Sequence, residues 1–449
     1  MHNCSKYYLF FTFILLVNIA QAQVDERYNE EEPSAFIPSE GSIQILKLKK
    51  SYALGDGITF RSASGDLNLT QSLQTSMTVN SSNKNLSNSS SAFNIDRARL
   101  SLAANLFDSK FNVYGRLNLP ANFQSTTTGS RSFNTVLQEA YFEFRPSINH
   151  AFNIGLRADY IDSRETRIEG ESLSFINRSS ISSSFDAIFD FGIRYKGNYR
   201  LGRKQLIRPY LSFTTGDSRS SLQKNYGGFK YGARVDYLPF GKFSKGGEFY
   251  MDDLARESKP KLVIGGVYSF NNGATSAYGV NGGRYLYGDI AQKILLPDYI
   301  RTGSDFLFKY KGAYALGSYT QTKVIVPVGI AGYFKTNGTY VKYTQNAQQI
   351  SDSVLSKLNV GRGINIQAGY LFSSNWSIGF RYTELMADAK SQNFADYNKH
   401  YTMVLSKYLS GNNLKIQLEL GYDQLNKSII KTPTITDNYY SQLMLTVQL

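Results

Sequence analysis

Arginine and lysine side chains recur singly along this chain, separated by apolar residues rather than gathered in one cluster. Arg97, Arg99 and Arg116 follow this pattern, since each alternates with apolar residues at every second position. A guanidinium group is planar and can donate two hydrogen bonds to the paired oxygens of a phosphate or carboxylate. The chain has 449 residues, with 49 Lys and Arg against 35 Asp and Glu and a formal net charge of +14. These residues favour the binding of anions along an extended surface.

Residues suited to other chemistries are few. Beyond the first 22 residues the histidines are His150 and His400, which lie far apart in sequence, and the only cysteine is Cys4. A histidine-dependent hydrolase needs a nucleophile and an orienting acid near its histidine, and no spacing here indicates one. No Cys-His pattern with metal-ligand spacing occurs. We therefore expect no enzyme activity, no metal and no cofactor.

The first 56 residues differ in composition from the rest of the chain. Residues 1–22 have the features of a cleaved secretory signal: a positive Lys6, an apolar run from Tyr7 to Ile19, and Ala20-Gln21-Ala22 before Gln23. Residues 23–56 form an acidic lead-in, with six acidic residues and one arginine between positions 24 and 40. Because Cys4 lies within the signal, the exported chain would form no disulfide, and a large closed sheet would stabilise it instead.

From about residue 67 the chain repeats segments of some ten residues with strict alternation of apolar and polar positions. Ala98, Leu100, Leu102 and Ala104 form one apolar face, and Ile364, Ile366, Ala368 and Tyr370 form another. Alternation with a period of two is typical of strands with one apolar and one polar face. Aromatic residues make up 14% of the sequence, and mean hydropathy is −0.31. No later stretch approaches the ~20 apolar residues of a membrane-spanning helix.

The connections between these strands alternate between short and long. Short turns are predicted near 107–110, 146–149, 197–204, 311–312, 373–375 and 410–412. Long polar segments are predicted near 80–92, 120–135, 162–184, 215–225, 271–304, 324–361, 386–400 and 424–439. Segment 238–259 is an exception on the short-turn side. The pattern predicts an all-β protein, a transmembrane antiparallel up-and-down β-barrel of about 16 strands over residues 57–449, with short periplasmic turns and long extracellular loops.

A soluble β-sandwich or propeller is the alternative, but soluble strands are usually shorter than ten residues and no blade-sized repeat appears. Sixteen strands are enough for a water-filled lumen.

If the apolar face meets lipid, the basic residues that face the lumen outnumber the acidic ones. The basic residues are Arg97, Arg99, Arg116, Arg145, Arg157, Arg194, Lys196, Arg208, Lys230, Arg234, Lys309, Lys311, Arg381 and Lys415. The acidic residues are Glu139, Glu143, Asp159, Asp186, Asp190, Asp236, Glu419 and Asp423. A low-dielectric wall with this excess would raise the local anion concentration.

Several stretches resemble the phosphate-selective porin O and P family of outer-membrane channels. They include "RARLSLAANLFDSKFNVYGRLNL" at 97–119, "VLQEAYFEFRP" at 136–146 and "FNIGLRADYIDSRETRIEGESLSFINRS" at 152–179. Near the end they include "GINIQAGYLFSSNWSIGFRYTEL" at 363–385 and "GNNLKIQLELGYD" at 411–423. The resemblance implies a sixteen-stranded barrel, commonly a homotrimer in outer-membrane lipids, that passes anions. It also implies that arginines and lysines around a constriction select phosphate.

The favoured hypothesis is an outer-membrane porin for passive diffusion of small solutes, preferring small anions such as phosphate. Its pore-lining residues would be Arg97, Arg99, Arg116, Arg157, Arg164, Arg167, Arg178, Lys309 and Lys311. Segment 162–184 could fold into the lumen and narrow it, or cap the outer rim. A closed barrel acting as a receptor, adhesin or structural partner is the second hypothesis, because acidic residues in the lumen could form ion pairs that block it. Nucleic-acid binding is not expected, because the charges are spread singly through an exported chain.

Overall fold

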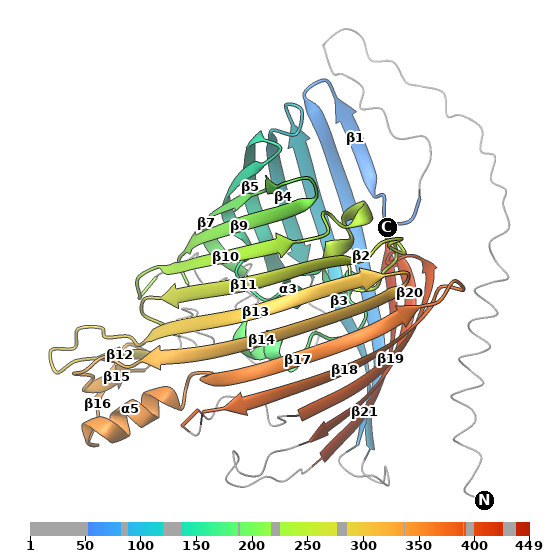
Figure 1. Ribbon diagram of the computed structural model, residues 1–449. Helices are drawn as coiled ribbons and strands as arrows, with labels where there is room; N and C mark the ends of the chain where they lie inside the picture. Colours follow the sequence, from blue (N-terminus) through green and yellow to red (C-terminus); the bar gives the residue numbers. More distant parts are fainter. Residues whose placement is uncertain are drawn as a thin grey trace, which may run out of the picture. The chain divides into compact units, whose positions relative to one another are not determined.

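The computed structural model describes residues 53–81, 89–119, 136–186, 189–216, 225–275, 285–335, 337–388, 390–391, 399–424 and 437–449. Within them, 16 antiparallel strands form a closed barrel (Figure 1). The predicted signal segment and nearly all of the acidic lead-in lie outside the described residues. The barrel strands are β2 (Gly65–Ser81), β3 (Ser89–Leu106), β4 (Phe111–Asn118), β5 (Leu137–Ser147), β6 (His150–Ala158), β7 (Phe189–Gly197), β9 (Gln205–Thr214), β10 (Lys230–Leu238), β11 (Lys261–Asn271), β13 (Asp298–Tyr310), β14 (Ala313–Ile325), β17 (Gly361–Leu371), β18 (Trp376–Ala387), β19 (Lys399–Ser410), β20 (Leu414–Gln424) and β21 (Asp437–Gln448).

Each strand pairs with its neighbour in the chain, and β21 closes the ring by pairing with β2, where Met77 lies opposite Leu443. Two short strands extend the same sheet: β1 (Ile58–Ser62) pairs with β2, and β8 (Tyr199–Leu201) pairs with β9. A closed ring satisfies the backbone groups of every barrel strand, which is the condition for a sheet to cross a bilayer. The predicted fold is therefore confirmed. In the part of the chain that the structure describes, no helix is both long enough and apolar enough to span a membrane.

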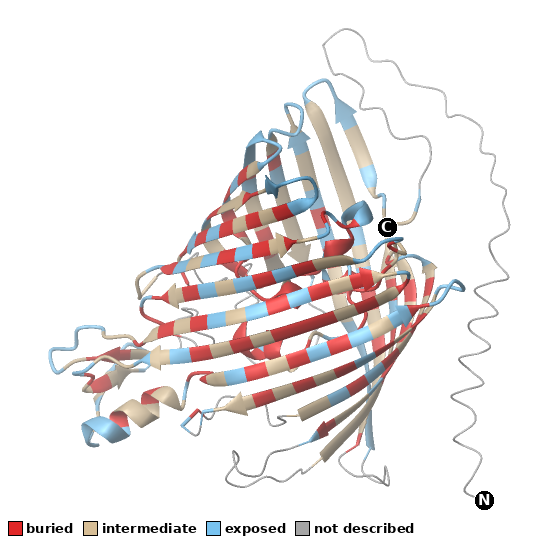
Figure 2. Cartoon of the chain, viewed as in Figure 1, coloured by how far each residue is buried: buried red, intermediate tan, exposed pale blue. Residues whose placement is uncertain are grey.

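Side chains alternate between the inside and the outside of the barrel, as the sequence predicts. In β13, Arg301, Asp305 and Lys309 are buried, whereas Phe306 is exposed. The same alternation of buried and exposed positions runs along most strands (Figure 2). The exposed positions carry apolar and aromatic side chains such as Ile366 and Phe380, so the outer wall is apolar and the inner wall is polar.

The connections also alternate as predicted, with short turns at one rim of the barrel and long connections at the other. Positive φ angles mark several of the short turns, among them Lys311-Gly312 between β13 and β14 and Asn375 between β17 and β18. Several long connections, such as the one before β13, are shorter than the sequence indicates, because the strand begins inside the segment predicted as a loop. Two of these connections form a three-stranded sheet of β12 (Leu286–Gly288), β15 (Gly332–Phe334) and β16 (Tyr340–Lys342), and helix α5 (Ala347–Leu355) follows it.

Two connections enter the barrel and fill part of it. The inner loop, residues 159–186, carries helix α3 (Arg164–Arg167), the 3-10 helix η1 (Gly170–Ser172) and helix α4 (Ser180–Phe185). The turn segment, residues 239–260, enters from the short-turn rim and carries η3 (Ser244–Phe249). The interior therefore differs from the open lumen expected from strand number alone. The sequence leaves two placements open for segment 162–184, inside the lumen or over the outer rim. The structure has the inner loop inside the barrel.

Candidate functional site

The inner loop is held together at its base by one carboxylate. Asp186, at the end of α4, accepts hydrogen bonds from the hydroxyl groups of Ser163 and Thr166 and from the backbone N–H of Ser163. Ser163 is also the N-cap of α3. The two ends of the loop are thus joined, and this satisfies polar groups that would otherwise be buried without partners.

Arginines of the inner loop pair with aspartates of the barrel wall. The guanidinium group of Arg164 lies 2.8 Å from Oδ1 of Asp236 on β10 and 3.0 Å from Oδ1 of Asp305 on β13. Arg167 lies 3.1 Å from Asp236, and Arg234 on the wall lies 2.6 Å from Asp305. Both aspartates are almost completely buried. Removing one partner of such a cluster would leave a buried charge uncompensated, which costs about 3–5 kcal/mol.

Acids of the inner loop pair, in turn, with arginines of the opposite wall. Glu171 lies 2.9 Å from Arg99 on β3, and Glu169 lies 2.7 Å from Arg116 on β4, which is also 3.4 Å from Glu139 on β5. We call these five residues the charged contact. Burial alone would raise the pKa of Glu171, but Arg99 and a hydrogen bond from Ser72 lower it to about 2. The carboxylate of Glu171 therefore stays ionised at neutral pH.

The turn segment is anchored by a buried lysine. The amino group of Lys309 on β13 donates hydrogen bonds to three backbone carbonyls, those of Gly247 at 2.7 Å, Tyr250 at 2.9 Å and Asp252 at 2.8 Å. The carboxylate of Asp252 accepts hydrogen bonds from the hydroxyl groups of Ser377 and Tyr408, on β18 and β19. These contacts fix the segment across the inside of the barrel.

The inner loop and the turn segment meet inside the barrel. The backbone N–H of Met251 donates a hydrogen bond of 3.0 Å to the carbonyl of Ser172. A hydrophobic cluster surrounds this contact and joins both segments to inward-facing wall positions. Its members are Ile168, Leu173, Leu206, Leu238, Phe243, Met251, Val263, Leu307, Tyr314 and Leu316. This part of the interior is packed like a protein core and leaves no room there for a wide channel.

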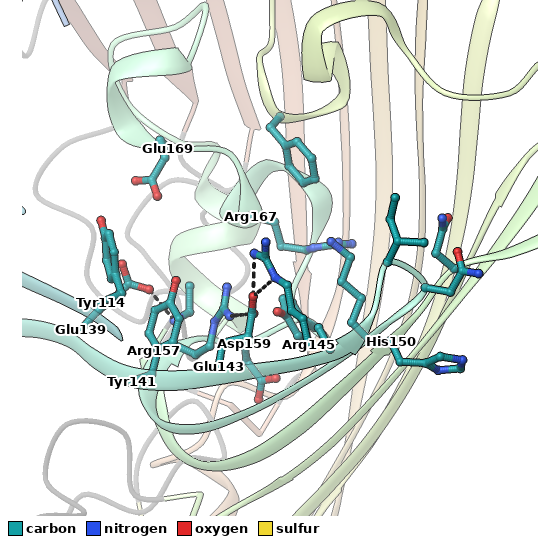
Figure 3. Close-up of a pocket in the computed structure, with 18 of the residues that line it drawn as sticks. Tyr114, Glu139, Tyr141, Glu143, Arg145, His150, Arg157, Asp159, Arg167 and Glu169 are labelled. Atoms are coloured by element: carbon teal, nitrogen blue, oxygen red, sulfur yellow. Dashed lines mark hydrogen bonds and ion pairs between the residues drawn. The ribbon is translucent and has the colours of Figure 1, made fainter. Parts of the chain in front are cut away.

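Space remains along the opposite wall, formed by β4 to β7. A cavity of about 690 Å³, which we call the vestibule, lies there between the charged contact and the short-turn rim (Figure 3). It reaches that rim because Ile148 and Asn149, in the turn between β5 and β6, line it. Its polar lining includes five basic residues, Arg116, Arg145, Arg157, Arg167 and Lys196, and four acidic residues, Glu139, Glu143, Asp159 and Glu169.

The acidic residues of the vestibule are engaged by cations. Glu143 lies 2.7 Å from Arg145 and 3.4 Å from Arg157. Asp159 is fully buried and lies 3.2 Å from Lys230, a residue that does not line the vestibule. Because Lys230, which lies outside the vestibule lining, neutralises the negative charge of Asp159, the vestibule surface carries a positive excess.

The structure places the basic residues predicted to line a pore in three settings. Arg97, Arg99, Arg116 and Arg157 project inward from the wall. Arg97 donates a hydrogen bond to Gln74 and occupies the space that a side chain at Gly170 of the inner loop would need. Arg164, Arg167 and Arg178 lie on the inner loop, where Arg178 donates to the carbonyl of Ile168. Lys309 is buried beneath the turn segment, whereas Lys311 is exposed in the β13–β14 turn, with its amino group above the ring of Tyr310.

The alternation in the sequence predicts that Lys196 faces the lumen, although Lys196 is not among the predicted pore-lining residues. It does not predict the inward position of Asp305. The segment 271–304 contains Gly and Pro and has no alternation, so it indicated a loop extending almost to Asp305. The structure instead starts β13 at Asp298. Among the described residues, no group of three or more His, Cys, Asp or Glu side chains is arranged to hold a metal ion.

Structural comparison finds bacterial porins. OmpF of Salmonella typhi, solved in complex with daunomycin, is 10% identical over 87% of this chain and 100% of that chain, with a TM-score of 0.50. An anion-selective porin from Comamonas acidovorans is 9% identical over 86% of this chain and 100% of that chain, with a TM-score of 0.49. The outer membrane channel DcaP of Acinetobacter baumannii is 11% identical over 87% and 99% of the two chains, with a TM-score of 0.43.

No protein-family model and no curated protein matches the sequence. The likeness to OmpF concerns the fold alone, and it supports a porin-type barrel. Because this likeness shows the fold and no family model matches, membership of the phosphate-selective family remains a prediction.

Proposed function

We propose that this protein is a bacterial outer-membrane channel that lets small solutes diffuse passively and prefers anions. The observation that supports this most directly is the vestibule, a cavity of about 690 Å³ inside a closed barrel and lined by charged side chains. Solutes would pass between the inner loop and the β4–β7 wall, rather than along the barrel axis. Export by the signal of residues 1–22 belongs to the same proposal.

The preference for anions follows from the charge of the passage. Its lining includes Arg116 on β4, Arg157 on β6 and Lys196 on β7. In a narrow passage with a low-dielectric wall, an excess of fixed cations concentrates anions and excludes cations. Phosphate is a reasonable solute on the same grounds, because arginine binds it with two hydrogen bonds. A homotrimeric assembly is proposed from the family resemblance.

A second candidate is a closed barrel that serves as a receptor or structural partner. The hydrophobic cluster around Met251 and Leu307 favours it, because the inner loop and the turn segment fill part of the interior with apolar packing. The contact of Arg116 with Glu169 also bridges the loop and the wall. The two candidates differ in one property, the passage of ions.

Planar-bilayer recording of the purified, folded protein separates these candidates. We expect discrete conductance steps whose reversal potential across a KCl gradient shows a preference for chloride, and block by added phosphate if phosphate is a solute. Steps without phosphate block would leave an anion-preferring channel without phosphate selectivity. No steps from protein that is shown to be folded by its far-UV circular dichroism would contradict the channel function and favour the closed barrel.

A further inference from the structure

One aromatic side chain on the vestibule surface is exposed, although the inside of the barrel is otherwise polar or tightly packed. Phe249, in the turn segment, is 41% exposed and lines the vestibule. An apolar ring facing water carries a hydration cost that is removed when a second apolar surface covers it. The ring is therefore suited to contact with a solute that itself has an apolar face.

The backbone around Phe249 is fixed on both sides. Lys309 donates hydrogen bonds to the carbonyls of Gly247 and Tyr250, and the carboxylate of Glu248 pairs with Arg208 on β9. These contacts hold the ring in place before any solute arrives. A solute that stacks on it does not need to order the segment, which reduces the entropic cost of binding.

A cation without an acidic partner lies beside the ring. The amino group of Lys196 on β7 is 5.9 Å from the ring centroid of Phe249, and both residues line the vestibule. Among the described residues, no carboxylate lies within ion-pair distance of this amino group. Lys196 therefore differs from Arg116 and Arg145, whose charges are matched by Glu169 and Glu143.

More aromatic surface and a second cation lie on the wall of the same cavity. The guanidinium carbon of Arg157 is 4.3 Å from the ring centroid of Tyr141 and 4.5 Å from that of Tyr160. Figure 3 shows Arg157 with Tyr141 and Glu143 on this wall. Arg157 therefore adds to the same wall a positive charge that is held against two aromatic rings.

We propose that the vestibule binds organic anions that carry a carboxylate on a flat ring, such as aromatic carboxylates. The carboxylate would accept hydrogen bonds from Lys196, and the ring would cover Phe249. Inorganic phosphate or a short aliphatic carboxylate could use the cation but would leave the phenyl ring in water. This inference rests on the proposed channel function, because it names the solute class that the passage retains.

Equilibrium binding to the detergent-solubilised protein tests the site independently of conduction. Isothermal titration calorimetry would compare benzoate, acetate and inorganic phosphate at constant ionic strength. We expect benzoate to bind about three- to tenfold more tightly than acetate, as expected for one aromatic contact. Phe249→Ala should remove this difference, Phe249→Tyr should keep it, and Lys196→Gln should weaken both carboxylates.

Matched controls lie in the same turn segment but outside the vestibule. Phe240 is 49% exposed and does not line the cavity, so Phe240→Ala should leave benzoate binding unchanged, as should Lys242→Gln at an exposed lysine. Equal affinities for benzoate and acetate, or loss of benzoate binding in Phe240→Ala as well, would overturn the inference. Because calorimetry requires no current, benzoate binding without conductance would contradict the channel function alone, and conductance without ring-dependent binding would contradict this inference alone.

Discussion

At the scale of single residues, the inside of the barrel is characterised by near-complete pairing of charges. Glu169 is the most accessible acid of the charged contact, since its side chain is 51% exposed while it lies 2.7 Å from Arg116 and 3.7 Å from Arg99. Its carboxylate offsets both guanidinium groups at the inner end of the vestibule. The anion preference of the passage is therefore weaker than its arginines alone would give.

Replacing this carboxylate should strengthen the preference for anions. In Glu169→Gln, we expect the chloride-to-potassium permeability ratio to rise by about twofold or more, because one fixed negative charge is removed from a low-dielectric passage. Reversal potentials in planar bilayers measure the ratio. Asp352→Asn is the control, because Asp352, on α5, pairs with Lys390 and does not line the vestibule. An unchanged ratio in Glu169→Gln would show that solutes do not pass this contact.

At the scale of elements, the inner loop depends on a buried carboxylate with an unusual pKa. Asp162 is buried, and its Oδ1 accepts a hydrogen bond of 2.9 Å from Arg301 on β13. Burial and the nearby carboxylate of Asp186 raise the pKa of Asp162 from 3.8 to about 7, against the opposing effects of Arg301 and Lys230. The folded loop therefore binds a proton more tightly than the unfolded loop does.

The sign of the pH dependence follows from this difference. The stabilising effect of the proton is present at low pH and is lost as the pH rises through about 7, so the loop should open more readily at pH 8.5 than at pH 5.5. Hydrogen–deuterium exchange of residues 160–168, corrected for the intrinsic effect of pH, measures the opening. In Asp162→Asn the pH effect should be much smaller. Equal protection of the wild-type loop at both pH values would contradict the raised pKa.

At the scale of the whole molecule, the two inward segments decide how much of the barrel is open. The turn segment spans the interior between Lys309 on β13 and the β18–β19 wall at Ser377 and Tyr408, and it meets the inner loop at Ser172. The passage is consequently confined to the β4–β7 side. A sixteen-stranded barrel without such segments would have a wide aqueous lumen.

Shortening the turn segment should therefore enlarge the channel. We expect replacement of residues 242–258 by a tight glycine-containing turn, combined with Lys309→Met, to raise single-channel conductance by about twofold or more and to lower the thermal stability. Lys309→Met removes the amino group that would otherwise be buried without its three carbonyl acceptors. The single variant Lys309→Met is the control for the shortened protein. Unchanged conductance after shortening would show that the segment does not obstruct the passage.

The features of the barrel that depend on local alternation can be predicted from the amino-acid sequence alone. The inward direction of Arg99 and the outward direction of Leu100 follow from the period of two along a strand, because successive side chains point to opposite faces of a sheet. The number of strands and the alternation of short and long connections follow from the same pattern. Strands are harder to predict where the sequence is locally irregular. The alternation does not predict the start of β13, because Pro297 and Gly303 interrupt it.

What occupies the barrel, and which charges meet there, depends on contacts between residues that are distant in the sequence. Arg164 and Asp305 are 141 positions apart, and the contact of Ile176 with Glu419 spans 243 positions. Both an inward and an outward placement of the inner loop were compatible with its polar composition. The inward placement depends on ion pairs between the loop and the wall and on the apolar packing around Met251. These contacts exist only when the barrel has closed. A linear pattern fixes the direction of a side chain, but not the distant group that it contacts.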